Sequence, residues 1–319
     1  MSAGAASSGA RSHRLGTAMA VDAVTANVVS ALRQAGIASL LLRGPAIARW
    51  LYAEGETRAY RDVDLLVEPE RCADTEAVLA GLGLVHRQAG FAPGESVEHA
   101  SEWICRRPSV VVDLHRGIEG VRADPAELWA ALTSDHHQMD VAGLMADVPG
   151  QPALALIVAL HAAHHGVEGG KHLEELRLAL QRADLETWQE AKRLAERVEA
   201  IPSLAAGLRL LTEGAAVAER LQLPHDTDRV TALRAASAHS TAIGFARLLA
   251  APGVRGKLTL AARKLVPTPA FMRHWSRLAR RGRPGLALAY LWRPVWLLLH
   301  LVPAGIAWMR ARRSPRSWA

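Results

Sequence analysis

The chain has 319 residues, of which 50% are hydrophobic and 22% are charged. This composition can bury a hydrophobic core, so it excludes a disordered protein. The two cysteines, Cys72 and Cys105, exclude a disulfide framework and a four-thiolate zinc site, and they indicate a reduced cytoplasmic protein. The N-terminal residues lack the apolar region of a secretory signal peptide, and we expect residues 1–18 to form a disordered leader.

The formal net charge of +7 conceals a strong asymmetry along the chain. After Asp228 there are 17 Lys and Arg residues and no Asp or Glu. Residues 1–228 hold the remaining 21 basic residues against all 31 acidic ones, which is a net charge of −10. A strongly basic C-terminal segment suggests a polyanionic partner, either nucleic acid or an anionic membrane surface. We therefore expect a cytoplasmic protein, with peripheral attachment to the inner face of the membrane as the alternative.

Hydrophobic spacing in the first half predicts strands that alternate with helices. Gly36 ends the first helix, and Arg43-Gly44-Pro45 interrupts the chain after the first strand. The last two strands form an antiparallel pair across residues 107–109. We expect helices over 19–35, 46–53 and 75–81, and strands over 37–42, 63–67, 84–88, 103–106 and 110–115. This order predicts an α/β domain over residues 19–122.

From about residue 124 the apolar residues recur with the spacing of helices. We expect an all-helical domain over 123–250 and a basic, Trp-containing helical tail over 251–319, with breaks at prolines that include Pro294 and Pro303. The most apolar stretch, 287–309, has three interpretations: a tail packed on the helical domain, an interfacial helix with Trp292, Trp296 and Trp308 at the headgroups, or a membrane span. The packed tail is favoured.

Three aspartates at the predicted strands carry the chemistry. Asp62 and Asp64 are two residues apart, so both side chains point to one face of a strand, and Asp113 lies on a later apolar strand. Neighbouring carboxylates repel each other unless a cation lies between them, and Mg²⁺ prefers such oxygen ligands. Three carboxylates are enough for two metal ions, Mg²⁺ or Mn²⁺, that act on a phosphoryl transfer. We therefore predict Asp62, Asp64 and Asp113 as catalytic metal ligands.

Residues around the aspartates are candidates for nucleotide binding. Gly44 allows the backbone to approach a phosphate, as do the amides at the start of the next helix. Arg58 and Arg61 flank the aspartates and have two interpretations: contacts to a triphosphate or an acidic acceptor, or structural partners of the aspartates in the metal-free protein. His115 follows Asp113 by two residues and has two interpretations: it orients the substrate or the metal-bound water, or it caps the strand.

Other histidines are less informative. His161 and His165 are four residues apart on a predicted helix and share a face, but the zinc-protease motif requires a Glu where this chain has Ala162. A packed histidine pair between domains is therefore favoured over a zinc site. His136 and His137 are expected in a solvated turn.

At these residues the sequence resembles the nucleotidyltransferase superfamily that includes DNA polymerase beta, and within it a branch of largely uncharacterised bacterial nucleotidyltransferases. The resemblance covers about residues 20–290. The matching segments, in order, are Arg43-Gly44, Leu51-Tyr52, Arg58, Asp62-Val63-Asp64-Leu65-Leu66-Val67, Asp113-Leu114-His115, Leu160–His165 and Asp184–Trp188. Two departures are Arg43 in place of a lysine and Pro45 in place of the usual serine, which removes a hydroxyl and an amide from the phosphate loop.

The resemblance implies an α/β (α+β) nucleotidyltransferase-like mixed sheet followed by a helical domain. It implies Mg²⁺-dependent transfer of a nucleoside monophosphate from an NTP to an unknown acceptor (a small molecule, a peptide or RNA), with Arg43 at the phosphates and Asp113 helping to deprotonate the acceptor. Two alternatives remain. One is an inactive binding or scaffold module for a phosphorylated ligand or a membrane surface, and the other is a related metal-dependent transfer in natural-product or peptide tailoring.

Overall fold

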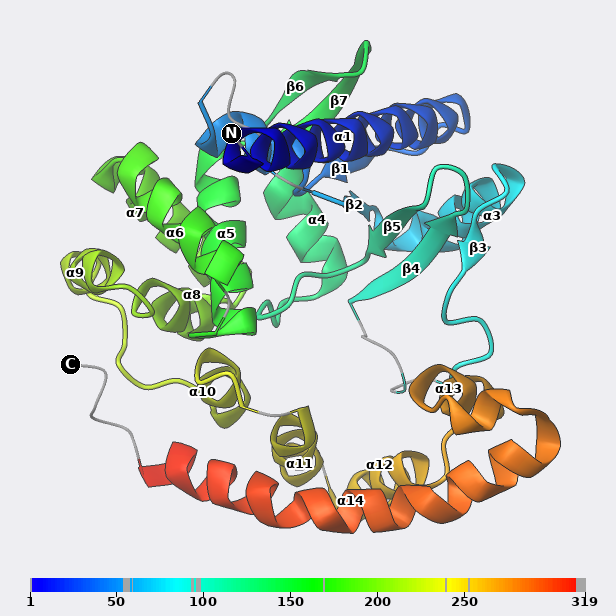
Figure 1. The fold of residues 1–319 in the computed structure, drawn as a ribbon. Helices are drawn as coiled ribbons and strands as arrows, with labels where there is room; N and C mark the ends of the chain where they lie inside the picture. Colours follow the sequence, from blue (N-terminus) through cyan, green and yellow to red (C-terminus); the bar gives the residue numbers. More distant parts are fainter. Residues whose placement is uncertain are drawn as a thin grey trace. The chain divides into compact units, whose positions relative to one another are not determined.

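The computed structural model describes residues 2–53, 58, 60–92, 95, 99–168, 170–238, 240–251 and 253–313 (Figure 1). Its contacts divide the chain into two compact units. The sheet unit comprises Met1–Arg87, His99–Val158 and Glu174–Ala200, and the helical unit comprises Gln88–Glu98, Ala159–Leu173 and Ile201–Ala319. This division differs from the predicted boundary at 122, because the helical segments that follow residue 122 pack with the sheet. For example, the backbone N–H of Arg122, the last residue of the predicted sheet domain, donates to the carbonyl of Val198 in the predicted helical domain.

A five-stranded mixed sheet with the order β1-β2-β5-β4-β3 forms the centre of the sheet unit. Strands β2 and β5 are parallel, and the other neighbouring pairs are antiparallel. All five predicted strands and the antiparallel β4–β5 pair are present, and the mixed α/β fold class is confirmed. The elements are α1 Ser2–Gln34, β1 Ser39–Leu41, α2 Pro45–Leu51, β2 Asp62–Val67, η1 Pro69–Arg71, α3 Cys72–Gly81, β3 Val85–His86, β4 Ala100–Cys105 and β5 Val110–His115.

Helix α1 lies against β2 and β5 and contributes core side chains to the sheet unit. Among the described residues, one helical stretch, Leu15–Gln34, is long and apolar enough to cross a membrane. Val21, Val28 and Leu32 of this stretch are fully buried, as expected for a core helix. The predicted disordered leader over 1–18 is wrong for the described residues, because α1 begins at Ser2; the Ala-rich leader has no proline to stop the helix.

The sheet unit continues with a hairpin and helices: α4 Pro125–Thr133, β6 His136–Val141, β7 Leu144–Pro149, the first part of α5 Gln151–His165, most of α6 Gly170–Arg182, and α7 Leu185–Arg197. The hairpin corrects the prediction of an all-helical region after residue 122 and of a solvated turn at His136 and His137, which lie in β6. Ala142 and Gly143 both have positive φ, 52° and 84°, as a tight two-residue hairpin turn requires.

The helical unit contains the end of α5 and the start of α6, followed by α8 Ile201–Leu208, α9 Thr212–Arg220, α10 Arg229–Ala235, α11 Ser240–Ala250, α12 Gly253–Leu265, α13 Pro269–Trp275, η2 Leu278–Arg280 and α14 Gly282–Arg313. Two small apolar clusters lie here, one around Leu233 and one around Met272. A loop between β3 and β4 belongs to this unit, because Glu95 accepts hydrogen bonds from the backbone and hydroxyl of Thr268, both at 2.6 Å.

Helix α14 corrects the predicted breaks at Pro294 and Pro303, since it runs without interruption from Gly282 to Arg313 and curves along its length (Figure 1). A proline removes one backbone hydrogen bond, and a long helix can bend there instead of ending.

Arg293 is buried in this helix. Its Nε donates to the carbonyl of Lys264 and its guanidinium lies 4.8 Å from the ring centroid of Trp275.

Candidate active site

The three predicted carboxylates lie together on one face of the sheet. Asp62 and Asp64 are alternate residues of β2, and Asp64 is paired in register with Asp113 on the parallel neighbour β5. Residues paired in this way on adjacent strands point to the same face. The period-two pattern of the two strands, together with their parallel pairing in this register, gathers the three carboxylates.

Asp64 is the most buried of the three, with 2% of its side chain exposed. Its Oδ1 accepts from Nη2 of Arg43 and, at 2.9 Å, from Nε2 of His115. Burial alone would raise the pKa of Asp64, but the charge of Arg43 and the contact with His115 outweigh it and hold this pKa well below its usual range. Arg43 is thus the structural partner of an aspartate, the role considered in the sequence for Arg58 and Arg61.

The pKa of Asp113 is shifted in the opposite direction to that of Asp64. Burial, followed by the charges of Asp64 and Asp62, raises its pKa from 3.8 to about 7. Its Oδ1 is buried and has no hydrogen-bond partner. A buried, partnerless carboxylate oxygen beside two other carboxylates is a donor set that a hard divalent cation such as Mg²⁺ would satisfy. Asp62, Asp64 and Asp113 therefore fit the predicted metal ligands by their chemistry.

Glu102 is a fourth acidic residue at this face, and the sequence analysis missed it. It lies on β4 directly opposite Asp113 in the antiparallel register, and its charge contributes to the raised pKa of Asp113. Oε2 of Glu102 also accepts from Nη1 of Arg87 at 2.8 Å. The strand was predicted to begin at Trp103, so Glu102 was not placed in the sheet. Residues 100–105 do not alternate between apolar and polar types, so the sequence carries no period-two signal for the first residues of this strand.

Gly44 lies in the loop that follows β1, and Arg58, which comes after α2, is hydrogen-bonded to that loop. Gly44 has a φ of +64°, and a Cβ there would lie 3.3 Å from the carbonyl oxygen of Asp62, so the backbone passes close to β2 because this residue is glycine. Arg58 is buried; its Nη1 donates to the carbonyl of Gly44 at 3.1 Å and its Nε to Oε1 of Glu175 at 2.8 Å. Arg58 holds the loop in place, whereas the side chain of Arg61 is exposed.

His115 links the carboxylates to a second histidine. Nδ1 of His115 lies 3.3 Å from the carbonyl oxygen of Gly117, and its ring stacks on His99 with centroids 5.9 Å apart. Nδ1 of His99 in turn lies 2.7 Å from Oε2 of Glu119. These contacts fix the His115 ring against Asp64, so His115 orients a site carboxylate rather than merely capping its strand.

A mixed sheet with converging acidic side chains beside a glycine loop is an arrangement suited to metal-assisted phosphoryl transfer. Residues 11–255 match the family described as uncharacterised nucleotidyltransferases. The chain belongs to this family. The predicted class of enzyme, a nucleotidyltransferase, is thereby confirmed.

Solved structures offer only distant similarity. The antibiotic-resistance factor ANT(2'')-Ia in solution is 18% identical with a TM-score of 0.39, over 55% of this chain and 90% of that one. A crystal structure of ANT(2'')-Ia with adenylyl-2''-tobramycin gives 18% identity and a TM-score of 0.38, over 53% and 94%. An antigenic nucleotidyltransferase-like protein from Paracoccidioides brasiliensis gives 16% and 0.34, over 62% and 95%. No curated protein matches the chain.

Proposed function

We propose that this protein transfers a nucleoside monophosphate from an NTP to an acceptor hydroxyl and releases pyrophosphate, with Mg²⁺ or Mn²⁺ held by Asp62, Asp64 and Asp113. The observation that carries the proposal is the register of β2 and β5, which brings the carboxylates together and leaves Oδ1 of Asp113 buried without a partner. The bound metal ions would supply charge neutralisation for the triphosphate and the leaving pyrophosphate.

The chain's own residues would position the reactants and move one proton. The acceptor oxygen forms a bond to the α-phosphorus, the bond from that phosphorus to the β-phosphate oxygen breaks, and the acceptor proton passes to a base. Asp113 is the candidate base, since the resemblance implies that it helps to deprotonate the acceptor. Arg43 lies beside Asp64 with 19% of its side chain exposed, and it would pair with a phosphate bound there.

Two other functions use the same residues. A binding module without turnover is favoured by Pro45, which offers neither hydroxyl nor amide to a phosphate. A related metal-dependent transfer to a peptide or natural product would keep the same three carboxylates and change only the acceptor. Release of pyrophosphate separates the first alternative from the proposed enzyme, and the identity of the labelled product separates the second.

The test measures binding and turnover together. Each NTP is titrated calorimetrically with and without Mg²⁺, and pyrophosphate release is followed with candidate small-molecule, peptide and RNA acceptors. We expect Mg²⁺-dependent NTP binding and turnover that the double variant Asp62→Asn/Asp64→Asn reduces by at least about 100-fold. The matched control is Asp226→Asn, which removes an exposed carboxylate in the helical unit. Binding of NTP that does not depend on Mg²⁺ or on the aspartates would overturn the proposal.

We also propose that the tail binds an anionic lipid surface from the cytoplasmic side. Exposed apolar side chains of α14 recur three and four residues apart and so share one helix face: Leu288, Leu291, Trp292, Val295, Leu298 and Leu299. The chain after Asp228 supplies 17 basic residues and no acidic ones for the lipid headgroups. Of the predicted interfacial tryptophans, Trp292 is exposed, Trp296 packs against Trp275, and the Trp308 side chain lies outside the described residues.

Co-flotation with vesicles tests this surface. We expect binding to vesicles that contain phosphatidylserine, much weaker binding to neutral vesicles, and loss of binding in Leu291→Glu/Leu298→Glu. Lipid binding that is unchanged in this variant refutes the apolar face. Binding to nucleic acid but not to anionic vesicles would assign the basic tail to a nucleic-acid partner instead.

A further inference from the structure

Three histidines gather in the helical unit, which contains none of the three aspartates. His161 and His165 are one turn apart on α5, and His172 lies near the start of α6. The ring centroids of His172 lie 4.2 Å from His161 and 3.8 Å from His165, and those of His161 and His165 are 4.6 Å apart. The sequence placed His161 and His165 on one face but gave no third ligand, because His172 comes from the next helix.

The turn between α5 and α6 is held firmly. The N–H of Val167 donates to the carbonyl of Ala235 at 3.0 Å, and the N–H of Glu168 donates to Oγ of Ser237 at 3.0 Å. The Ser237 hydroxyl in turn donates to the carbonyl of His165 at 3.1 Å. Gly166 has a φ of +72°, and a Cβ there would lie 2.2 Å from the carbonyl oxygen of Arg234. The backbone that brings His172 to the α5 pair is therefore fixed by α10 and the residues after it.

We propose that His161, His165 and His172 bind one divalent transition-metal ion of the Zn²⁺ type. One nitrogen from each ring lies within 4.8 Å of the other two. Tetrahedral zinc with Zn–N bonds of about 2.1 Å separates its ligand nitrogens by about 3.4 Å, so each ring must move by only about 1 Å. Neutral imidazole is a preferred ligand for Zn²⁺, Cu²⁺ and Ni²⁺, whereas the three aspartates of the sheet unit suit Mg²⁺.

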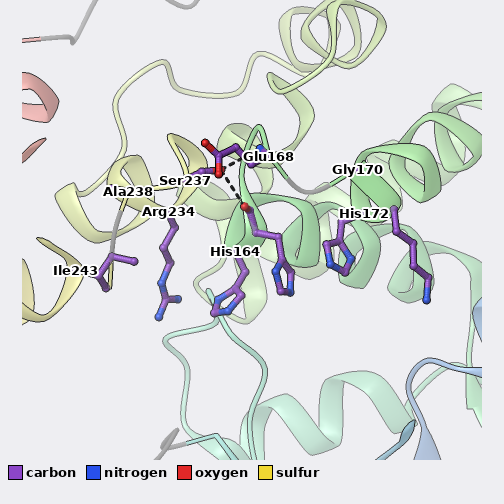
Figure 2. Close-up of a pocket in the computed structure, with 10 residues that line it drawn as sticks. His164, Glu168, Gly170, His172, Arg234, Ser237, Ala238 and Ile243 are labelled. Carbon is purple, nitrogen blue, oxygen red and sulfur yellow. Dashed lines mark hydrogen bonds between the residues drawn. The ribbon is translucent and has the colours of Figure 1, made fainter. Parts of the chain in front are cut away.

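Three protein ligands leave the fourth position of a tetrahedral ion open. His165 and His172 also line a cavity of about 470 Å³, together with Lys171 and Arg234. The side chains of His164, His172 and Arg234 point to the same side of the turn (Figure 2). Because Lys171 and Arg234 are cationic, the open position would favour a water molecule or an anionic oxygen ligand. The absence of a glutamate at Ala162 argues against a zinc-protease reaction here.

The test uses the full chain without a histidine tag. After treatment with a chelator, the protein is titrated with Co²⁺ and the visible d–d absorption of the bound ion is followed, with Zn²⁺ as the competitor. We expect one equivalent to bind with a tetrahedral spectrum. His165→Gln and His172→Gln should each weaken binding more than about 100-fold, because loss of a partner that only orients a ligand already costs about 10- to 100-fold.

Two controls make the outcome specific. His137→Gln removes an exposed histidine of β6, and Asp62→Asn/Asp64→Asn removes two of the proposed carboxylate ligands; both should keep the tetrahedral Co²⁺ spectrum at full strength. His165 is exposed at the end of α5, so His165→Gln should fold normally and can decide the question alone if His172→Gln does not fold. Absence of the tetrahedral Co²⁺ spectrum in the unmodified protein, or its retention in His165→Gln, would overturn the proposal whether or not the enzyme transfers nucleotides.

Discussion

Replacing Asp113 by Asn should stabilise the metal-free protein, and the gain should grow with pH. The folded state raises the pKa of Asp113 from 3.8 to about 7, so between these values the native protein binds a proton that the unfolded chain has lost. The free energy of unfolding then falls as the pH rises through this window. An asparagine at this position does not ionise, so the variant does not lose this stability as the pH rises.

The size of the effect follows from the two pKa values. A difference of about 3 pKa units corresponds to at most about 4 kcal/mol above pH 7, at about 1.4 kcal/mol per unit. Between about pH 5.5 and about pH 8 the stability of Asp113→Asn relative to the unmodified protein should rise by about 2 kcal/mol. Most of this change should occur below pH 7, because above that value Asp113 is ionised in both states.

Urea unfolding at a series of pH values, in the presence of a chelator, measures this difference. Asp226→Asn serves as the control, since it makes the same substitution at an exposed carboxylate of the helical unit. Saturating Mg²⁺ should raise the stability of the unmodified protein and leave that of Asp113→Asn nearly unchanged. A difference between the two proteins that is constant with pH, or that shrinks as pH rises, would refute the account of crowded carboxylates.

Three further substitutions test the contacts around the site, each by urea unfolding near neutral pH. Arg43→Ala leaves Asp64 as a poorly compensated buried charge and should lower the free energy of unfolding by about 3–5 kcal/mol. This loss should become smaller in acid, where Asp64 is protonated. An unchanged free energy of unfolding would show that Arg43 does not neutralise Asp64. Arg58→Lys cannot make both hydrogen bonds of the guanidinium, one to Glu175 and one to the Gly44 carbonyl, and should lower the free energy of unfolding by about 1–3 kcal/mol. Gly44→Ala forces a residue with a side chain to adopt a positive φ and should lower the free energy of unfolding by about 1–3 kcal/mol. A neutral effect would contradict the requirement for glycine at this position.

The sequence was sufficient to predict the carboxylate cluster because two local rules combine there. Alternation along a strand puts Asp62 and Asp64 on one face, and a later apolar strand that carries Asp113 can join the same sheet. The order in the sheet is not a local property. Nothing in residues 62–67 specifies that β5, and not β4, pairs with β2, and so the sequence alone could not specify that Asp64 and Asp113 are in register.

The residues that the sequence missed depend on contacts between segments distant in the chain. His172 joins His161 and His165 only because Gly166 turns the chain back and α10 holds that turn. Arg58 was a candidate phosphate ligand by its position before Asp62, but its partner Glu175 lies 117 residues later. The hairpin at Ala142 was missed for a different reason, since its signal is a two-residue turn inside a segment rich in helix-forming residues.

The electrostatics of the sheet face support the proposed metal site. Four acidic side chains approach one another there, and a purely structural cluster would be expected to pair each of them. Arg43 and His115 neutralise Asp64, and Arg87 pairs with Glu102, yet Asp113 keeps a buried oxygen without a hydrogen-bond partner and a pKa near 7. A divalent ion bound between these carboxylates would remove their mutual repulsion. The instability expected at Asp113 in the metal-free protein is therefore the thermodynamic counterpart of the proposed metal affinity, and both should disappear in the same variant.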